Sequence, residues 1–174
     1  MLFFYRQGVL AELIAMLARQ KKLQQERYER HGADYWEIAE FQKMPGIGAV
    51  GAHTFSGYIQ NPHRFSIRGE LISFCKLGVR SYRSDGRKLR SERLSKAGYG
   101  CLKEVSHRAW KVAKGGENEV NWFFQDSLKR CEGNQVHARL NTQRKILKTL
   151  WSLWKNKQTY RPEKFYSGDG DSAQ

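Results

Sequence analysis

The chain has 174 residues, and its 31 Lys and Arg against 17 Asp and Glu give a formal net charge of +14. This length is enough for one domain with a real hydrophobic core, and the charge favours a polyanionic partner, nucleic acid before an anionic membrane surface. Cys75, Cys101 and Cys131 are widely spaced without a CxxC pair, which argues against a zinc site and for a reducing compartment.

The N-terminus begins with a short apolar run that Arg6 and Gln7 interrupt. No stretch reaches the roughly 18 apolar residues of a membrane-spanning helix. A signal peptide is disfavoured too, because its charged region should precede its apolar one. We therefore expect a cytoplasmic protein without a membrane partner.

Residues 9–31 have the periodicity of a helix. Leu10, Leu13, Ile14 and Leu17 form an apolar stripe, whereas the sequence beyond Ala18 is mostly polar. A helix of this kind often projects from its domain or pairs with another helix. We expect a homo-oligomer held together through residues 9–31.

The sequence from Met44 to Ala52 organises the chain. A short helix over 35–44 precedes it and a second helix over 49–59 follows it, and Gly46 and Gly48 lie between them. Helix, Gly-x-Gly turn and helix is the pattern of a helix-hairpin-helix, here over 41–59, whose backbone N–H groups bind a phosphate. An ordinary tight helix-helix corner is the alternative.

Residues 76–103 are the most basic part of the chain, with nine Lys and Arg and two Asp and Glu. The segment is rich in Ser and Gly and has little periodicity, so we predict a loop. A basic loop after a phosphate-binding turn is best interpreted as a nucleic-acid surface, although a solvated loop is the simpler reading.

Residues 71–77 form a helix or a strand, and the helix is favoured because no alternating partner strand follows. Helical patterns return over 102–113, 119–130 and 137–155, and the tail 167–174 is predicted to be disordered. Trp122, Trp151 and Trp154 are either core residues or stacking platforms for bases, with the core favoured. His107 and His137 are expected to be packing or surface residues. The fold class is therefore mostly α: a helical domain over 35–166 with a helix-hairpin-helix, preceded by a helix within 1–34 that forms part of a coiled coil.

Four stretches, taken in order, resemble one family, the DEDD insertion-sequence transposases of family one-ten, related to the Piv site-specific invertase. The resemblance covers roughly residues 8–166 and is to the C-terminal transposase domain with the end of its coiled-coil connector. The stretches are Pro45-Gly46-Ile47-Gly48 with Ala52; Asn61-Pro62-His63-Arg64-Phe65; Leu77-Gly78-Val79 with Leu94-Ser95-Lys96-Ala97-Gly98 and Leu102; and Ala138-Arg139 with Leu147 and Trp151.

The resemblance implies recombination by a serine nucleophile in the basic loop, with magnesium or a similar divalent metal held by a separate RuvC-like domain. Many members are guided by a noncoding RNA. By position, the serine is Ser84, but the sequence reads Ser84-Asp85-Gly86 where the family has Ser directly followed by Gly. Ser81 also replaces a proline of the family.

We therefore expect the DNA-binding C-terminal domain of a transposase that acts in DNA transposition. The sequence leaves no room for a RuvC-like domain before residue 9, so we expect a truncated form, without a metal or cofactor of its own and inactive alone. A non-enzymatic helix-hairpin-helix nucleic-acid-binding protein is the alternative. The residues expected to contact DNA are Gly46, Gly48, Gly51, Arg80, Arg83, Arg87, Lys88, Arg90, Arg93 and Lys96.

Overall fold

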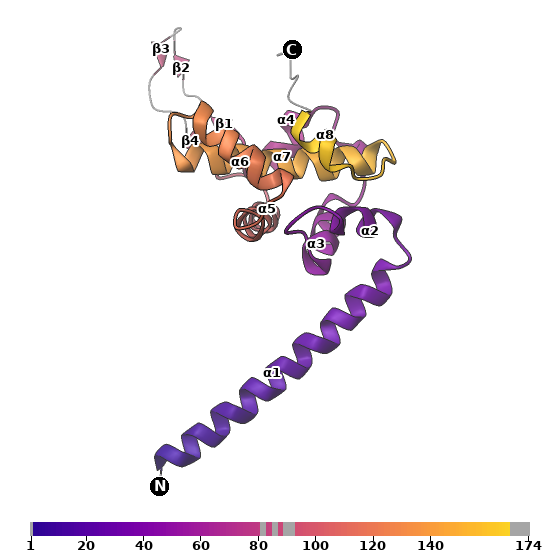
Figure 1. Cartoon of the computed structure of the whole chain (residues 1–174), viewed down its shortest axis with the longest axis vertical. Coiled ribbons are helices and arrows are strands. Elements are labelled where there is room, and N and C mark those ends of the chain that lie inside the picture. The colour runs from indigo at the N-terminus through magenta and orange to yellow at the C-terminus, as the bar shows by residue number, and fades with distance from the viewer. Residues whose placement is uncertain (1, 81–82, 85–86, 89–92, 168–174) are drawn as a thin grey trace.

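The computed structural model describes residues 2–80, 83–84, 87–88 and 93–167, and these are mostly helical (Figure 1). The longer helices are α1 (Leu2–Gly32), α3 (Ala49–Ile59), α5 (Gly100–Ala113), α6 (Glu119–Arg130) and α7 (Gln135–Lys155). The short elements are α2 (Trp36–Gln42), η1 (Pro62–Arg64), α4 (Arg68–Phe74), α8 (Pro162–Ser167), and the strands β1 (Val79–Arg80), β2 (Arg83–Ser84), β3 (Arg87–Lys88) and β4 (Arg93–Leu94).

Local sequence explains where several helices begin. Asn118 and Asn134 cap α6 and α7, because their side-chain oxygens accept hydrogen bonds from backbone N–H groups that have no acceptor within the helix. Asn61 does the same for η1. The mostly helical class is confirmed, and α3 and α6 have the bounds that their periodicity predicts. The sequence analysis did not predict α8.

The core forms where α5 and α6 pack against α7 and where α3 packs against α2 and α5. Phe41 of α2 meets Phe55 of α3 edge to face, with ring centroids 5.3 Å apart. The Trp151 indole N–H of α7 donates to the Pro62 carbonyl at 2.7 Å, which ties η1 to the core. These contacts fix the α2–α3 pair against the three long helices.

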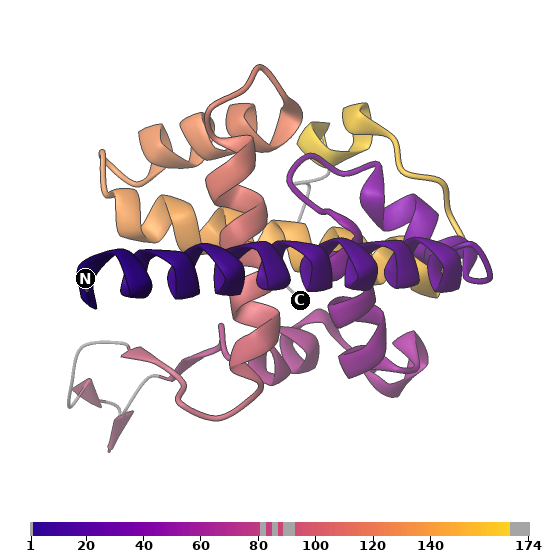
Figure 2. The ribbon, with the colours of Figure 1, turned by 90° about the horizontal axis from the view of Figure 1, so that it is seen from below.

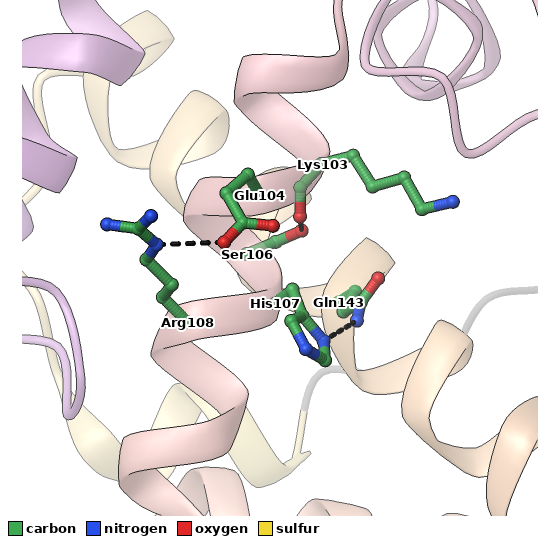
Figure 3. Close-up of polar contacts among 6 residues, drawn as sticks. All are labelled: Lys103, Glu104, Ser106, His107, Arg108 and Gln143. Atoms are coloured by element: carbon green, nitrogen blue, oxygen red, sulfur yellow. Dashed lines mark hydrogen bonds and ion pairs between the residues drawn. The ribbon is translucent and has the colours of Figure 1, made fainter.

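One side of α5 carries a polar seam (Figure 3). Gln143 Nε2 of α7 hydrogen-bonds His107 Nδ1 at 3.1 Å, so this histidine is held in the contact between two helices. One turn away, Arg108 Nε pairs with Glu104 at 2.8 Å, and this hydrogen bond lowers the pKa of the Glu104 carboxyl.

The N-terminal helix α1 runs away from the helical body (Figure 1). Only its C-terminal end is anchored: His53 Nε2 of α3 hydrogen-bonds the Tyr28 carbonyl at 2.7 Å, and the two rings lie 5.0 Å apart. Leu10, Ile14 and Leu17 are 58%, 66% and 63% exposed. The apolar stripe of α1 is therefore solvent-exposed in the single chain.

Two expectations need correction. Residues 76–103 are not simply a loop, because β1 pairs with β4 and β2 pairs with β3 in antiparallel register. Trp122 is 54% exposed on α6, so it is not a core residue, whereas Trp151 is 6% exposed. Of the tail 167–174 that was expected to be disordered, Ser167 is the last residue of α8, and residues 168–174 lie outside the described residues.

The described helices include none with both the length and the apolar character needed to cross a lipid bilayer.

Candidate nucleic-acid interface

The turn between α2 and α3 is packed closely against α5. Gly46 has φ +83°, and a Cβ atom at this position would lie 2.2 Å from the Ala109 carbonyl oxygen. Glycine is therefore needed here both for its backbone conformation and for the close approach of two backbones. Gly51 of α3 also faces α5, because a Cβ atom added there would lie 3.6 Å from Val105 Cγ1.

Gly48 lies in a different environment. It is the N-cap residue of α3, with φ −92°, no side-chain cap, and no atom within 4 Å of where a Cβ would be. The first N–H groups of a helix have no acceptor within it, and the helix dipole adds partial positive charge there. This exposed, uncapped end is thus the part of the turn best suited to an anion.

The basic stretch forms a narrow antiparallel ribbon, which we call the basic ribbon (β1–β4, residues 79–80, 83–84, 87–88 and 93–94). Its registered pairs are Val79 with Leu94, Arg80 with Arg93, Arg83 with Lys88, and Ser84 with Arg87. Figures 1 and 2 both show β2 and β3 beyond β1 and β4, away from the helices. The ribbon thus projects from the helical body.

The base of the ribbon is tied to the helices by backbone hydrogen bonds. Ser95 N–H donates to the Gly78 carbonyl at 2.7 Å, and Tyr99 N–H donates to the Phe74 carbonyl at 2.8 Å. Gly98, with φ +107°, allows this approach, because a Cβ there would lie 2.6 Å from the Phe74 carbonyl oxygen. The Arg144 side chain of α7 also donates to the Leu77 carbonyl, at 3.0 Å.

Two of the four ribbon pairs place a cationic residue opposite another. Directly opposite positions of an antiparallel pair share one face, with Cβ atoms about 5 Å apart, and like charges there are destabilising. Arg80–Arg93 and Arg83–Lys88 are such pairs. The backbone register therefore places cationic residues at paired positions along the ribbon.

The sequence-predicted site residues fall into two groups that the structure does not bring together. Gly46, Gly48 and Gly51 belong to the α2–α3 turn and α3, whereas the basic residues belong to the ribbon and its base, apart from that turn in both views (Figures 1 and 2). Arg93 and Lys96 are exposed. Ser84 lies on β2 opposite Arg87, and Arg90 lies outside the described residues.

The described residues contain no group of three His, Cys, Asp or Glu side chains placed to hold a metal ion. Cys75 is fully buried, and its burial raises the pKa of the thiol to about 12. This cysteine is therefore a packing residue.

The site thus consists of a glycine turn and a projecting basic ribbon on one helical body, an arrangement suited to a polyanion. Residues 39–121, which include the turn, the ribbon and α5, match the sequence profile of the Transposase IS116/IS110/IS902 family. The match confirms, over these residues, the family resemblance seen in the sequence. No curated protein matches the chain.

The cations of α7 were not among the site residues predicted from the sequence. Arg144, Lys145 and Lys148 line depressions on the surface of that helix. Lys148 follows Lys145 by three residues and Arg144 by four, and the other face of the helix is apolar. This spacing is the signal that identifies the three cations as one stripe. Only the tertiary structure shows that this stripe meets the base of the ribbon.

Proposed function

We propose that this transposase-family domain binds DNA through the basic ribbon, with the N-terminal end of α3 as an additional phosphate contact. The family match supports a role in transposition. The observation that carries the DNA-binding proposal is the pairing of Arg80 with Arg93 and of Arg83 with Lys88. Like charges at directly opposite positions are in general destabilising, and hydrogen bonds between Arg or Lys and phosphate are among the stronger kind, so the proposal places phosphates alongside these positions.

The mode of binding follows from the kind of groups involved. Arginine, lysine and backbone N–H groups contact phosphates, which fix the protein on the duplex without reading its sequence. We therefore expect slight sequence preference and a strong dependence on salt. If about five phosphates are engaged, log K should fall with log salt with a slope of about −4 to −5.

The experiment is a titration of a fluorescent DNA duplex with the full chain at several salt concentrations, read by anisotropy. A slope in the expected range, and similar affinity for unrelated sequences, would support the proposal. Binding that is absent at low salt, or that does not change with salt, would refute it.

We also propose, from the family resemblance, that the Ser84 hydroxyl oxygen attacks DNA phosphorus: a serine–phosphate ester forms as one P–O bond to a deoxyribose breaks, and the leaving sugar oxygen takes up a proton in exchange for the one that the serine loses. A serine hydroxyl needs activation, and charge on the phosphoryl oxygens must be stabilised by metal ions or cations. The backbone register pairs Ser84 with Arg87, and we propose that this arginine serves the second task. We expect serine-dependent protein–DNA adducts when a RuvC-like domain and magnesium are supplied with the chain, and none with Ser84→Ala.

The exposed stripe of α1 supports assembly of two copies. Leu10, Leu13, Ile14 and Leu17 follow the spacing that packs one helix against another, and each is at least 45% exposed. A second copy brings an identical stripe. We propose a dimer through residues 9–31.

A further inference from the structure

Three depressions follow α7 from the base of the ribbon to α8, and together we call them the α7 groove. The first lies between the β1–β4 pair and α7, and the second between α6 and α7; Asn141 and Arg144 line both. The third depression reaches α8, and it shares Lys145 and Lys148 with the second. Figure 1 shows α7 running between the ribbon base and α8. The depressions therefore form one continuous track.

The α7 groove is lined by cations from several elements. Arg93 enters the first depression from β4 and Arg130 enters the second from α6. The third is lined by Arg68, Arg161 and Lys164 in addition to the two shared lysines. Among the described residues that line these depressions there is no Asp or Glu. Asp126 of α6, which pairs with Arg130 at 3.0 Å, lines none of them.

Arg144 lies where the first two depressions meet. Its Nε donates to the Leu77 carbonyl at 3.0 Å, and its Nη1 donates to Asn141 Oδ1 at 3.3 Å. Both acceptors are uncharged, and the side chain is partly buried, which lowers the pKa of the guanidinium. A partly desolvated cation held by neutral acceptors gains from an incoming anion, because charge-assisted hydrogen bonds are the stronger kind.

Lys145 is held in place by aromatic rings. Its ammonium lies 5.5 Å from the centroid of the Phe123 ring and 5.9 Å from that of Phe165. Such contacts favour a cation at a fixed place beside the rings. Its charge is thereby positioned between the second and third depressions before any ligand arrives.

The length of the groove indicates a polymer. From Asn141 to Ser152, two lining residues of α7, the helix rises about 16 Å, at about 1.5 Å per residue. A small anion would use one cluster of cations, whereas cations spread over this length match phosphates repeated along a strand.

The Phe and Tyr rings that line the groove favour a duplex over a single strand; among the described aromatic side chains of the lining, only His137, in the first depression, is exposed. Phe123, Tyr160 and Phe165 are only 5%, 6% and 1% exposed, so they offer no surface on which an unpaired base could stack. We propose that the α7 groove binds the phosphate backbone of duplex DNA, as a second contact surface that extends from the basic ribbon. This inference rests on the proposed DNA-binding function.

The test compares two doubly substituted full chains that carry the same net charge. Lys148→Gln with Lys164→Gln removes two cations of the groove. Lys111→Gln with Lys114→Gln removes two exposed lysines at the end of α5 that do not line it. Each is titrated with a DNA duplex and with an RNA duplex of equal length over a range of salt. Lys164→Gln alone, at an exposed position, is the second variant if the double substitution disturbs the fold.

We expect the groove variant to bind DNA at least tenfold more weakly than the control variant. Its log–log salt slope should be shallower by about 2, since each lost phosphate contact lowers the slope by about 0.9. Equal losses in the two variants would overturn the groove proposal, and so would a loss confined to the RNA duplex. If the unsubstituted chain binds no DNA, the proposed function itself fails. If ribbon variants weaken binding and groove variants do not, only the groove proposal fails.

Discussion

Gly46 of the α2–α3 turn packs directly against the Ala109 carbonyl oxygen of α5. A Cβ atom added to Gly46 would lie only 2.2 Å from that oxygen. Two residues along the chain, Gly48 meets no atom within 4 Å at the corresponding position. The two glycines of one short motif therefore have different roles. The first serves packing, and the second leaves the end of α3 open.

Gly46→Ala should destabilise the fold. The residue has φ +83°, which costs an L-residue about 1–2 kcal/mol, and the methyl group would meet backbone that cannot easily move. We expect a loss of about 2–4 kcal/mol in the free energy of unfolding, measured by urea denaturation. Gly48→Ala is the matched control and should lose less than about 1 kcal/mol. Equal midpoints for the two variants would contradict the packing role of Gly46.

Gly48→Asp should separate stability from binding. An Asp at the N-cap accepts a hydrogen bond from the first turn of α3, which stabilises the helix by a few tenths of a kcal/mol. The same carboxylate would occupy the proposed phosphate site and repel a phosphate there. We expect weaker DNA binding with unchanged or higher thermal stability. Gly48→Asn is the control that provides a cap without the charge. If both variants bind DNA as well as the natural chain does, the turn has only a packing role.

Glu40→Gln should make the stability less dependent on pH. Burial raises the pKa of the Glu40 carboxyl, but hydrogen bonds from the Lys43 ammonium and the Tyr160 N–H outweigh it, so the pKa is lowered overall. A lowered pKa contributes stability that is present above the unfolded value, about 4.3, and is lost as the pH falls through the folded value. Urea midpoints between pH 7 and pH 3 should fall more steeply for the natural chain than for the variant.

Substitution of the α1 stripe should abolish self-association. Leu13→Ser with Leu17→Ser removes two apolar side chains that are 45% and 63% exposed, so the folded single chain should be undisturbed. Light scattering at high micromolar concentration should report a dimer for the natural chain and a monomer for this variant. Val112→Ser, at a 69% exposed position on α5, is the control that should remain dimeric. A natural chain that is already monomeric would contradict the proposed dimer.

Much of the fold was predictable because its signals are local. The periodicity of apolar residues predicted α3 and α6 at their observed bounds, and Pro45 with the two glycines predicted the turn between α2 and α3. Short, charged strands carry no such signal. β1 to β4 have two residues each, so the period of two that identifies a strand has no length over which to appear.

The candidate site was only partly predictable, because its parts meet through tertiary packing. The sequence placed the positive charge of residues 76–103 correctly in one segment, but it did not reveal that Arg80 and Arg93 would be opposite each other. It also gave no sign that Arg144, 67 residues after Leu77, would donate to the Leu77 carbonyl. Contacts between residues so far apart in the sequence depend on how α7 packs, and no local sequence pattern encodes that packing.

The ribbon's charge pairing is tested most directly by reversing one of its charges. Lys88→Glu puts an opposite charge beside Arg83, which should stabilise the ribbon by about 0.2–1 kcal/mol while removing a phosphate contact. Lys111→Glu makes the same change of net charge on α5. In matched anisotropy titrations of a DNA duplex, we expect Lys88→Glu to bind about tenfold more weakly than Lys111→Glu, a difference of about 1.4 kcal/mol. Equal affinities for the two variants would contradict DNA binding by the basic ribbon.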